Sequence, residues 1–159
     1  MQEPALRYVS LGRDTTQPLE TREPRNERTD IVKDGRLLAR HIRPGEFRNG
    51  LAFYSENEEF LQVGTWRYNS GHALRAHCHN TVPREINRTN EVVIVLQGSM
   101  AARIFDEQQQ LVTTVTVGKG ELLVLMNGGH DYTILEDDTR ILEIKNGPFL
   151  GKDIDKTLF

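Results

Sequence analysis

Short apolar runs separated by turn residues are the feature of this sequence that most restricts its fold. From Ile31 onward, brief stretches rich in Val, Ile, Leu and Tyr alternate with Gly, Asn and Asp. This spacing is typical of β-strands joined by turns, and no stretch is long and periodic enough for a major helix. The sequence therefore predicts an all-β protein, built as a sandwich or a barrel.

The strands expected from this pattern cover most of the chain after residue 30. They are Ile31–Val32, Leu37–Ile42, Leu51–Tyr54, Gln62–Tyr68, Ala73–His79, Glu91–Gln97, Ala101–Phe105, Leu111–Val117, Leu122–Met126, Asp131–Glu136 and Arg140–Lys145. Asp34-Gly35 predicts a hairpin turn. Ser55 and Glu58 form a capping-box pattern that predicts a short helical turn over Glu56–Leu61. The run Glu91–Gly98 is apolar on both faces, which predicts a strand covered on both sides.

The first 30 residues differ in composition from the rest. Between residues 10 and 30, only Leu11 and Leu19 are apolar, so this stretch has little surface to bury. We expect residues 1–30 to form an extended arm, either flexible or lent as a strand to a partner subunit, with a solvated tail as the alternative. Residues 31–159 are expected to form one folded domain.

Composition and charge exclude several classes of protein. The net charge is −3 with scattered basic residues, which does not favour nucleic-acid binding. No apolar run is long enough to span a membrane, and the N-terminal residues do not resemble a signal peptide. A single cysteine, Cys78, excludes an internal disulfide. We therefore expect a cytoplasmic protein with no membrane or nucleic-acid partner.

The pair His77 and His79 is the first candidate for a functional site. Residues two apart on a β-strand project from the same face, so both imidazoles would point the same way. Neutral imidazole is the commonest metal ligand in proteins. Two histidines at this spacing, taken alone, could also be half-exposed polar residues without a metal. The spacing of the surrounding residues therefore decides between the two interpretations.

That spacing resembles the two sequence motifs of the cupin superfamily over about residues 62–146. Gly71, His77, His79, Glu91 and Gly98 match the first motif except for the eleven residues between His79 and Glu91, where cupins have a much shorter gap. The second motif is approximated by Gly120, Gly128 and His130, with Met126 where proline is typical and one residue fewer before the histidine. The insert at 80–90 and the stretch 141–148 are also similar to a group of small bacterial cupins of unassigned activity.

The resemblance implies a single cupin domain, a jelly-roll barrel holding one divalent metal ion. Its ligands would be His77, His79, Glu91 and His130, with Glu85 as a competing carboxylate for the place of Glu91. Fe is the metal we expect first, and Mn, Ni, Co or Zn fit the same mixed nitrogen and oxygen ligands. Cys78 should then point away from the metal and pack behind the strand, whereas His41 and His72 are expected to be structural or surface residues.

Strand alternation extends the candidate site beyond the metal ligands. Tyr132 follows His130 on the same face and is a candidate catalytic hydrogen-bond or proton donor. Arg75 shares the face of His77 and is the second catalytic candidate, because an Arg fork binds carboxylate or phosphate. The candidate substrate-binding residues are Arg67, Gln97 and Lys145. Several of these candidates also have a structural alternative. Tyr132 could be a packed aromatic, Arg67 and Arg75 could be solvated side chains, and Lys145 could pair with Glu143.

Two classes of function follow from this site. The first is a metal-dependent enzyme, a dioxygenase or an isomerase or lyase, acting on a small anionic or oxygen-rich substrate. The alternative is a non-catalytic cupin module that binds a metal or a sugar-like ligand without turnover. An epimerase-like acid–base site is disfavoured, because the adjacent His130 and Asp131 should point apart on a strand. We expect a homodimer formed by pairing or exchanging edge strands.

Overall fold

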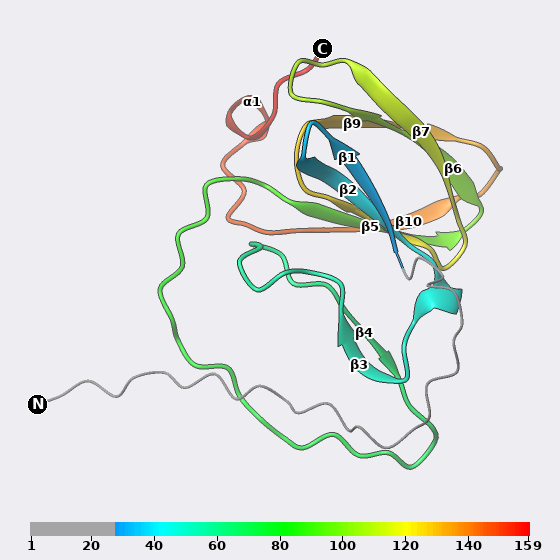
Figure 1. Ribbon diagram of the computed structural model, residues 1–159, viewed down its shortest axis with the longest axis vertical. Helices are drawn as coiled ribbons and strands as arrows, with labels where there is room; N and C mark the ends of the chain where they lie inside the picture. Colours follow the sequence, from blue (N-terminus) through cyan, green and yellow to red (C-terminus); the bar gives the residue numbers. More distant parts are fainter. Residues whose placement is uncertain (1–27) are drawn as a thin grey trace, which may run out of the picture.

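Antiparallel strands are the main regular structure of residues 28–159, the part of the chain that the computed structural model describes (Figure 1). They are β1 (Thr29–Lys33), β2 (Arg36–Ile42), β3 (Gly50–Phe53), β4 (Gly64–Arg67), β5 (Glu91–Gln97), β6 (Ser99–Phe105), β7 (Leu111–Gly118), β8 (Leu122–Leu125), β9 (Gly129–Ile134) and β10 (Arg140–Lys145). The expected all-β class is therefore confirmed. The proposed N-terminal arm lies outside the described residues except for its last three positions, two of which already belong to β1.

The strands form three layers. The largest is a five-stranded sheet in the order β1-β2-β8-β5-β10, and one of its faces packs against a three-stranded sheet in the order β7-β6-β9. The third layer is the two-stranded hairpin of β3 and β4, which packs on the other face of the five-stranded sheet. The five-stranded sheet is thus the middle layer, with apolar side chains needed on both of its faces.

Strand β5 shows how the sequence satisfies that requirement. Val93 and Val95 belong to the cluster between the two larger sheets, while Val92 belongs to the cluster beneath the hairpin. Strand β8 alternates in the same way, with Leu123 on one side and Val124 on the other. Successive side chains of a strand point to opposite faces, so a central strand of three layers must be apolar at every position. The expectation that β5 is covered on both sides is confirmed for its buried part.

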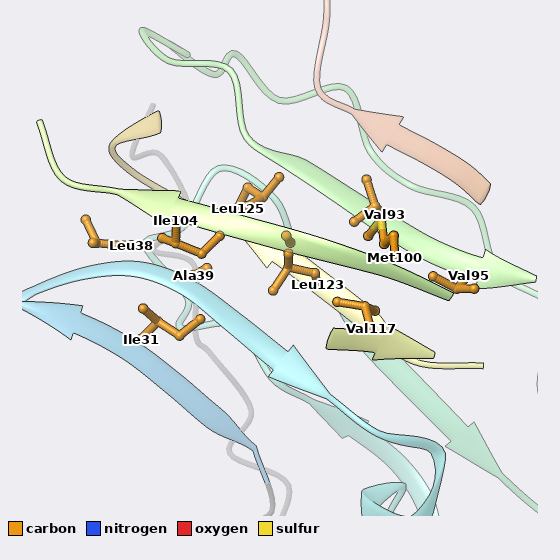
Figure 2. Close-up of a cluster of buried hydrophobic side chains, with 11 residues drawn as sticks. Ile31, Leu38, Ala39, Val93, Val95, Met100, Ile104, Val117, Leu123 and Leu125 are labelled. Carbon is orange, nitrogen blue, oxygen red and sulfur yellow. The ribbon is translucent and has the colours of Figure 1, made fainter. Parts of the chain in front are cut away.

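The main core lies between the two larger sheets. Side chains from β1, β2, β5, β6, β7 and β8 meet there, and Figure 2 shows them filling the space between the ribbons. The members of this cluster are Ile31, Leu38, Ala39, Val93, Val95, Met100, Ala102, Ile104, Val117, Leu123 and Leu125. Burial of these aliphatic side chains, at about 25 cal/mol per Å² of apolar surface, is the main force holding the two sheets together.

The turn between β1 and β2 forms as the sequence predicts. Asp34 and Gly35 both adopt positive φ angles, 51° and 75°, and Lys33 lies opposite Arg36 in the antiparallel register. Two residues with positive φ are the requirement of a type I′ turn, whose twist matches that of the strands it connects.

Two local predictions are wrong. Residues 73–79 form no strand, and the whole stretch 68–90 has neither helix nor strand; Figure 1 shows this green segment bowing away from the sheets between β4 and β5. Residues 56–61 contain turns and bends but no helix. The Ser55 hydroxyl does not cap a helix, because its oxygen accepts a hydrogen bond from the backbone N–H of Val63 at 2.6 Å and closes the loop between β3 and β4 instead.

Helical structure in the described residues is confined to two short pieces. These are the 3₁₀ turn η1 (Pro44–Glu46) and the four-residue helix α1 (Lys152–Asp155). Within residues 28–159, no helix is long and apolar enough to cross a membrane.

Candidate metal-binding site

A cavity of about 620 Å³ opens where the edges of the two larger sheets face each other. Its wall includes the start of β5, the inward side of β9, part of β10 and the C-terminal segment from residue 155 to residue 159. The candidate ligands Glu91 and His130 line this cavity together with two further polar side chains, Tyr132 and Glu143. This volume is in the range of small-molecule binding sites.

Glu91 and His130 meet directly in this cavity. Glu91 precedes Val93 and Val95 on the inward face of β5, and His130 stands opposite the buried Ile104 in the register of β9 with β6. His130 Nε2 lies 3.1 Å from Glu91 Oε2. Two facing sheets therefore bring together side chains that are 39 positions apart in the chain.

The carboxylate of Glu91 is stabilised in its charged form. Its pKa is lowered mainly by the hydrogen bond with His130, which outweighs the opposing effect of burial. The ammonium of Lys145, 3.5 Å from Glu91 Oε1, lowers the pKa of Glu91 further. An ionised carboxylate beside an imidazole is a pair of donors that a divalent transition metal accepts.

Tyr132 lies next to this pair. Its ring centre is 5.4 Å from that of His130, and its side chain packs against the main core. Its hydroxyl is buried with no hydrogen-bond partner among the described residues. Burial raises the pKa of Tyr132 strongly, and the nearby charges of Glu91 and Glu143 raise it further, so the hydroxyl keeps its proton. A buried hydroxyl without a partner is costly, and a catalytic role is one of the reasons for which native proteins keep such a group.

Lys145 joins the site, whereas Gln97 does not. Lys145 Nζ lies 3.0 Å from Glu143 Oε1 and also contacts Glu91, and the hydrogen bond with Glu143 is the main reason that the pKa of Lys145 is raised. Gln97 is exposed and donates to Asp138 Oδ2 at 2.9 Å, at the far end of β5. The expected pairing of Glu143 with Lys145 is present, and the pair reaches the edge of the cavity.

His77 and His79 lie apart from Glu91 and His130. Their rings are 5.3 Å apart in an edge-on arrangement, and the Nδ1 atom of His77 lies 3.1 Å from the carbonyl oxygen of Arg75. Both side chains are exposed, and Cys78 between them is exposed rather than packed behind a strand, contrary to our prediction. Within residues 28–159, no three His, Cys, Asp or Glu side chains gather in a group that could hold a metal ion. The four predicted ligands therefore form two separate pairs in one copy of the chain.

The remaining candidates for substrate contact are also outside the cavity wall. Arg75 is exposed in the same segment as His77, and so is Glu85, the competing carboxylate. Arg67 lies on β4, where its guanidinium donates to the carbonyl oxygen of Phe47 at 3.4 Å. In one copy of the chain, none of these three side chains reaches the Glu91–His130 pair.

The C-terminal segment is the part of the site that sequence reasoning missed. The ring of Phe159 packs edge-on against Phe105 with 5.2 Å between centres, and it lies so close to Gly129 that a Cβ there would come within 2.7 Å of it. The Thr89 hydroxyl donates to Asp155 Oδ1 at 3.0 Å and ties the segment to the start of β5. The segment thus covers one side of the cavity, and only a glycine at position 129 permits the approach.

The two other histidines have structural surroundings, as predicted. His41 is buried and its Nε2 atom lies 2.7 Å from Glu121 Oε2. His72 is exposed and stacks on Tyr68 with 4.0 Å between ring centres. Asp131 pairs with Arg103 on the outer side of the three-stranded sheet, so it points away from His130 as strand alternation requires.

The chain matches no protein-family model, no curated protein and no solved structure. What can be said of its function therefore rests on the fold and on the geometry of this site.

Proposed function

We propose that this protein is a cupin-type metalloenzyme whose metal ion is held by Glu91, His130, His77 and His79. The observation that carries the proposal is the direct contact of His130 with the ionised Glu91 at the wall of a small-molecule-sized cavity. Both residues belong to the cupin-like motifs of the sequence, and they come from different sheets. The two-layer β core is the architecture that the proposal requires.

The charges around the cavity support a cation as the bound species. Its wall carries more acidic than basic side chains: Glu91, Asp106, Glu107, Glu143 and Asp155 against Arg88 and Lys156. Carboxylates gathered around a partly enclosed space favour a positive ligand. Imidazole with carboxylate suits Fe, Mn, Ni, Co or Zn, and three histidines with one carboxylate would leave open positions for a substrate.

When bound, such an ion would polarise an oxygen-rich substrate or activate a small co-substrate. The residues of the chain supply the rest of the site. The neutral Tyr132 hydroxyl is free to donate a hydrogen bond to a ligand in the cavity, because nothing in the described residues occupies it. The C-terminal segment, with Phe159, lines one side of the cavity. Lys145 offers positive charge at the edge and is shared between Glu91 and Glu143.

Metal content is the direct test of this proposal. The protein would be purified without a chelating tag, reconstituted with Fe(II) under anaerobic conditions or with Zn, and analysed by mass spectrometry. We expect close to one ion per chain, lost in Glu91→Gln/His130→Ala and in His77→Ala/His79→Ala. His72→Ala is the matched control, since His72 is an exposed histidine of the same segment that stacks on Tyr68 and should leave the metal content unchanged. Absence of metal from the reconstituted protein would overturn the proposal.

The identity of the metal would then select the reaction. Iron would favour a dioxygenase, checked by oxygen consumption with small oxygen-rich acids. Zinc would favour an isomerase or lyase, because Zn has no redox chemistry of its own. In either case Tyr132→Phe should lower kcat while the metal content stays constant, since Tyr132 lines the cavity and its unpartnered hydroxyl would be available to a substrate there.

A second candidate function is a cupin module that binds a ligand without turnover. The observation that favours it is that one copy of the chain brings only two of the four donors to the cavity. Such a module would bind small oxygen-rich ligands with no dependence on metal. Calorimetric titration of the chelator-treated protein distinguishes the two functions, because the enzyme should lose binding and the module should not.

A further inference from the structure

Strand β9 has an unpaired edge beside the candidate metal ligands. In the described structure it is the last strand of its sheet, hydrogen-bonded to β6 on one side only. His130 and Tyr132 point from β9 into the cavity, while Asp131 and Thr133 point outward. An exposed edge presents unpaired backbone N–H and C=O groups and accepts a further strand readily.

The segment 68–88 has the opposite property: it belongs to no sheet of the described structure. Every residue in it is exposed, including the apolar Leu74, Val82 and Ile86. Trp66, on β4 just before this segment, also keeps 61% of its surface accessible. A contiguous stretch with this much exposed apolar surface marks a surface that binds another molecule.

The two features also match in their chemistry. The cavity beside β9 holds one imidazole and one carboxylate, and the segment carries a second pair of imidazoles. If residues 73–79 pair with the edge of β9, the period of two places His77 and His79 on one face and Cys78 on the other. With the histidines directed into the cavity, four donors surround one point.

We propose that residues 73–79 of a second copy of this chain form a strand along the free edge of β9, so that each metal site is built from two chains. This inference rests on the proposed metal centre. The second copy is favoured over the same copy because the hairpin of β3 and β4 packs on the far face of the five-stranded sheet, away from β9. The segment then continues outward from that hairpin (Figure 1).

Reciprocal exchange gives a closed dimer. Each chain lends one segment and receives the other, so both unpaired edges and both exposed segments are covered in a single two-fold assembly. The sheets of each copy already form without the segment, so the exchange requires no rearrangement of their cores.

Cross-linking through the single cysteine tests this arrangement without any metal. Thr133 and Asp131 face outward on β9, on the side where Cys78 of the added strand would lie. Oxidation of Thr133→Cys or Asp131→Cys should give a reducible product with the mass of two 18.2-kDa chains. Loss of that product in Cys78→Ser/Thr133→Cys shows that Cys78 is one of the partners.

The controls separate the possible occupants of the edge. Thr114→Cys places a thiol on the outer side of β7, at the opposite edge of the same sheet, and should form no such product. A disulfide within one chain would show that the segment closes on its own copy and would overturn the proposal. The absence of a disulfide at both positions on β9 would overturn it as well.

Mixed dimers test the shared site through metal content. His77→Ala/His79→Ala and Glu91→Gln/His130→Ala would be co-expressed with two different non-chelating tags and purified through both. In an exchanged dimer, one of the two sites keeps all four ligands, so the metal content should return to half that of the wild type. If each chain builds its own site, no metal is recovered. If the disulfide forms but the wild type binds no metal, the strand exchange stands and the metalloenzyme proposal fails.

Discussion

Replacing Tyr132 by phenylalanine is expected to stabilise the protein. The Tyr132 hydroxyl is buried and has no hydrogen-bond partner among the described residues, while its ring packs against the main core. Leaving such a group unsatisfied costs about 1–3 kcal/mol, and the substitution removes the hydroxyl while keeping the ring. We therefore expect the free energy of unfolding to rise by about 1 kcal/mol or more. A site kept at the expense of stability is a mark of function.

The matched control is Tyr54→Phe. Tyr54 is also buried, but its hydroxyl donates a hydrogen bond to the carbonyl oxygen of Glu46 at 2.5 Å. Removing the Tyr54 hydroxyl breaks that hydrogen bond and leaves the carbonyl oxygen of Glu46 with one partner fewer. The free energy of unfolding should therefore fall by about 1 kcal/mol. The same chemical change is thus expected to have opposite signs at the two positions, and the two variants should differ by about 2 kcal/mol.

Urea denaturation at one fixed protein concentration measures both variants, because a dimer would otherwise make the midpoint depend on concentration. Equal m-values are needed for the comparison. If Tyr132→Phe proves less stable than the wild type by as much as Tyr54→Phe, the hydroxyl has a partner in solution, and the reasoning from an unsatisfied group is refuted.

Three further predictions concern the scaffold. Burial raises the pKa of Glu121, but hydrogen bonds from the backbone N–H of Gly118 and from His41 hold this pKa below its usual range. The stability that ionised Glu121 contributes is therefore present above the unfolded-state pKa and lost as the pH falls. Glu121→Gln should lower the free energy of unfolding, measured in urea, more at pH 7 than at pH 3. Gly128→Ala should lower Tm far more than Gly35→Ala, because both have positive φ but only at Gly128 would a Cβ lie 2.1 Å from a backbone carbonyl oxygen. Leu123→Ala, at a fully buried position, should cost about 3 kcal/mol in urea denaturation.

The five-stranded sheet was predicted best from the sequence. The predicted bounds of β5 and β10 agree with the structure at both ends. Strand β5 was recognisable because a strand buried on both faces is apolar at consecutive positions, and that signal is local. The resemblance to the cupin motifs implied that Glu91 and His130 lie at one site, and the structure brings the two side chains into contact.

The prediction for residues 73–79 was wrong for a physical reason. A period of two describes which side chains share a face once a strand exists, but a strand exists only when its backbone groups pair with a neighbour. No local pattern states which edge is free to receive it. The loop 55–63 shows the same limit, because the Ser55 hydroxyl can cap a helix or close a loop, and the position of Val63 decided for the loop.

Lys145 would let the proposed metal site gain and lose a cation. Its ammonium contacts Glu91 at 3.5 Å and Glu143 at 3.0 Å, so it neutralises the candidate ligand while keeping a second carboxylate in reach. An ion bound to Glu91 competes with Lys145 for the same oxygen atoms, and Glu143 can retain the lysine without a new desolvation cost. Without that second carboxylate, binding a cation would leave an ammonium unpaired at the cavity edge. In the proposed site, Glu143 and Lys145 would therefore balance the charge with and without the ion, and this balance depends on the two side chains sharing one face of β10.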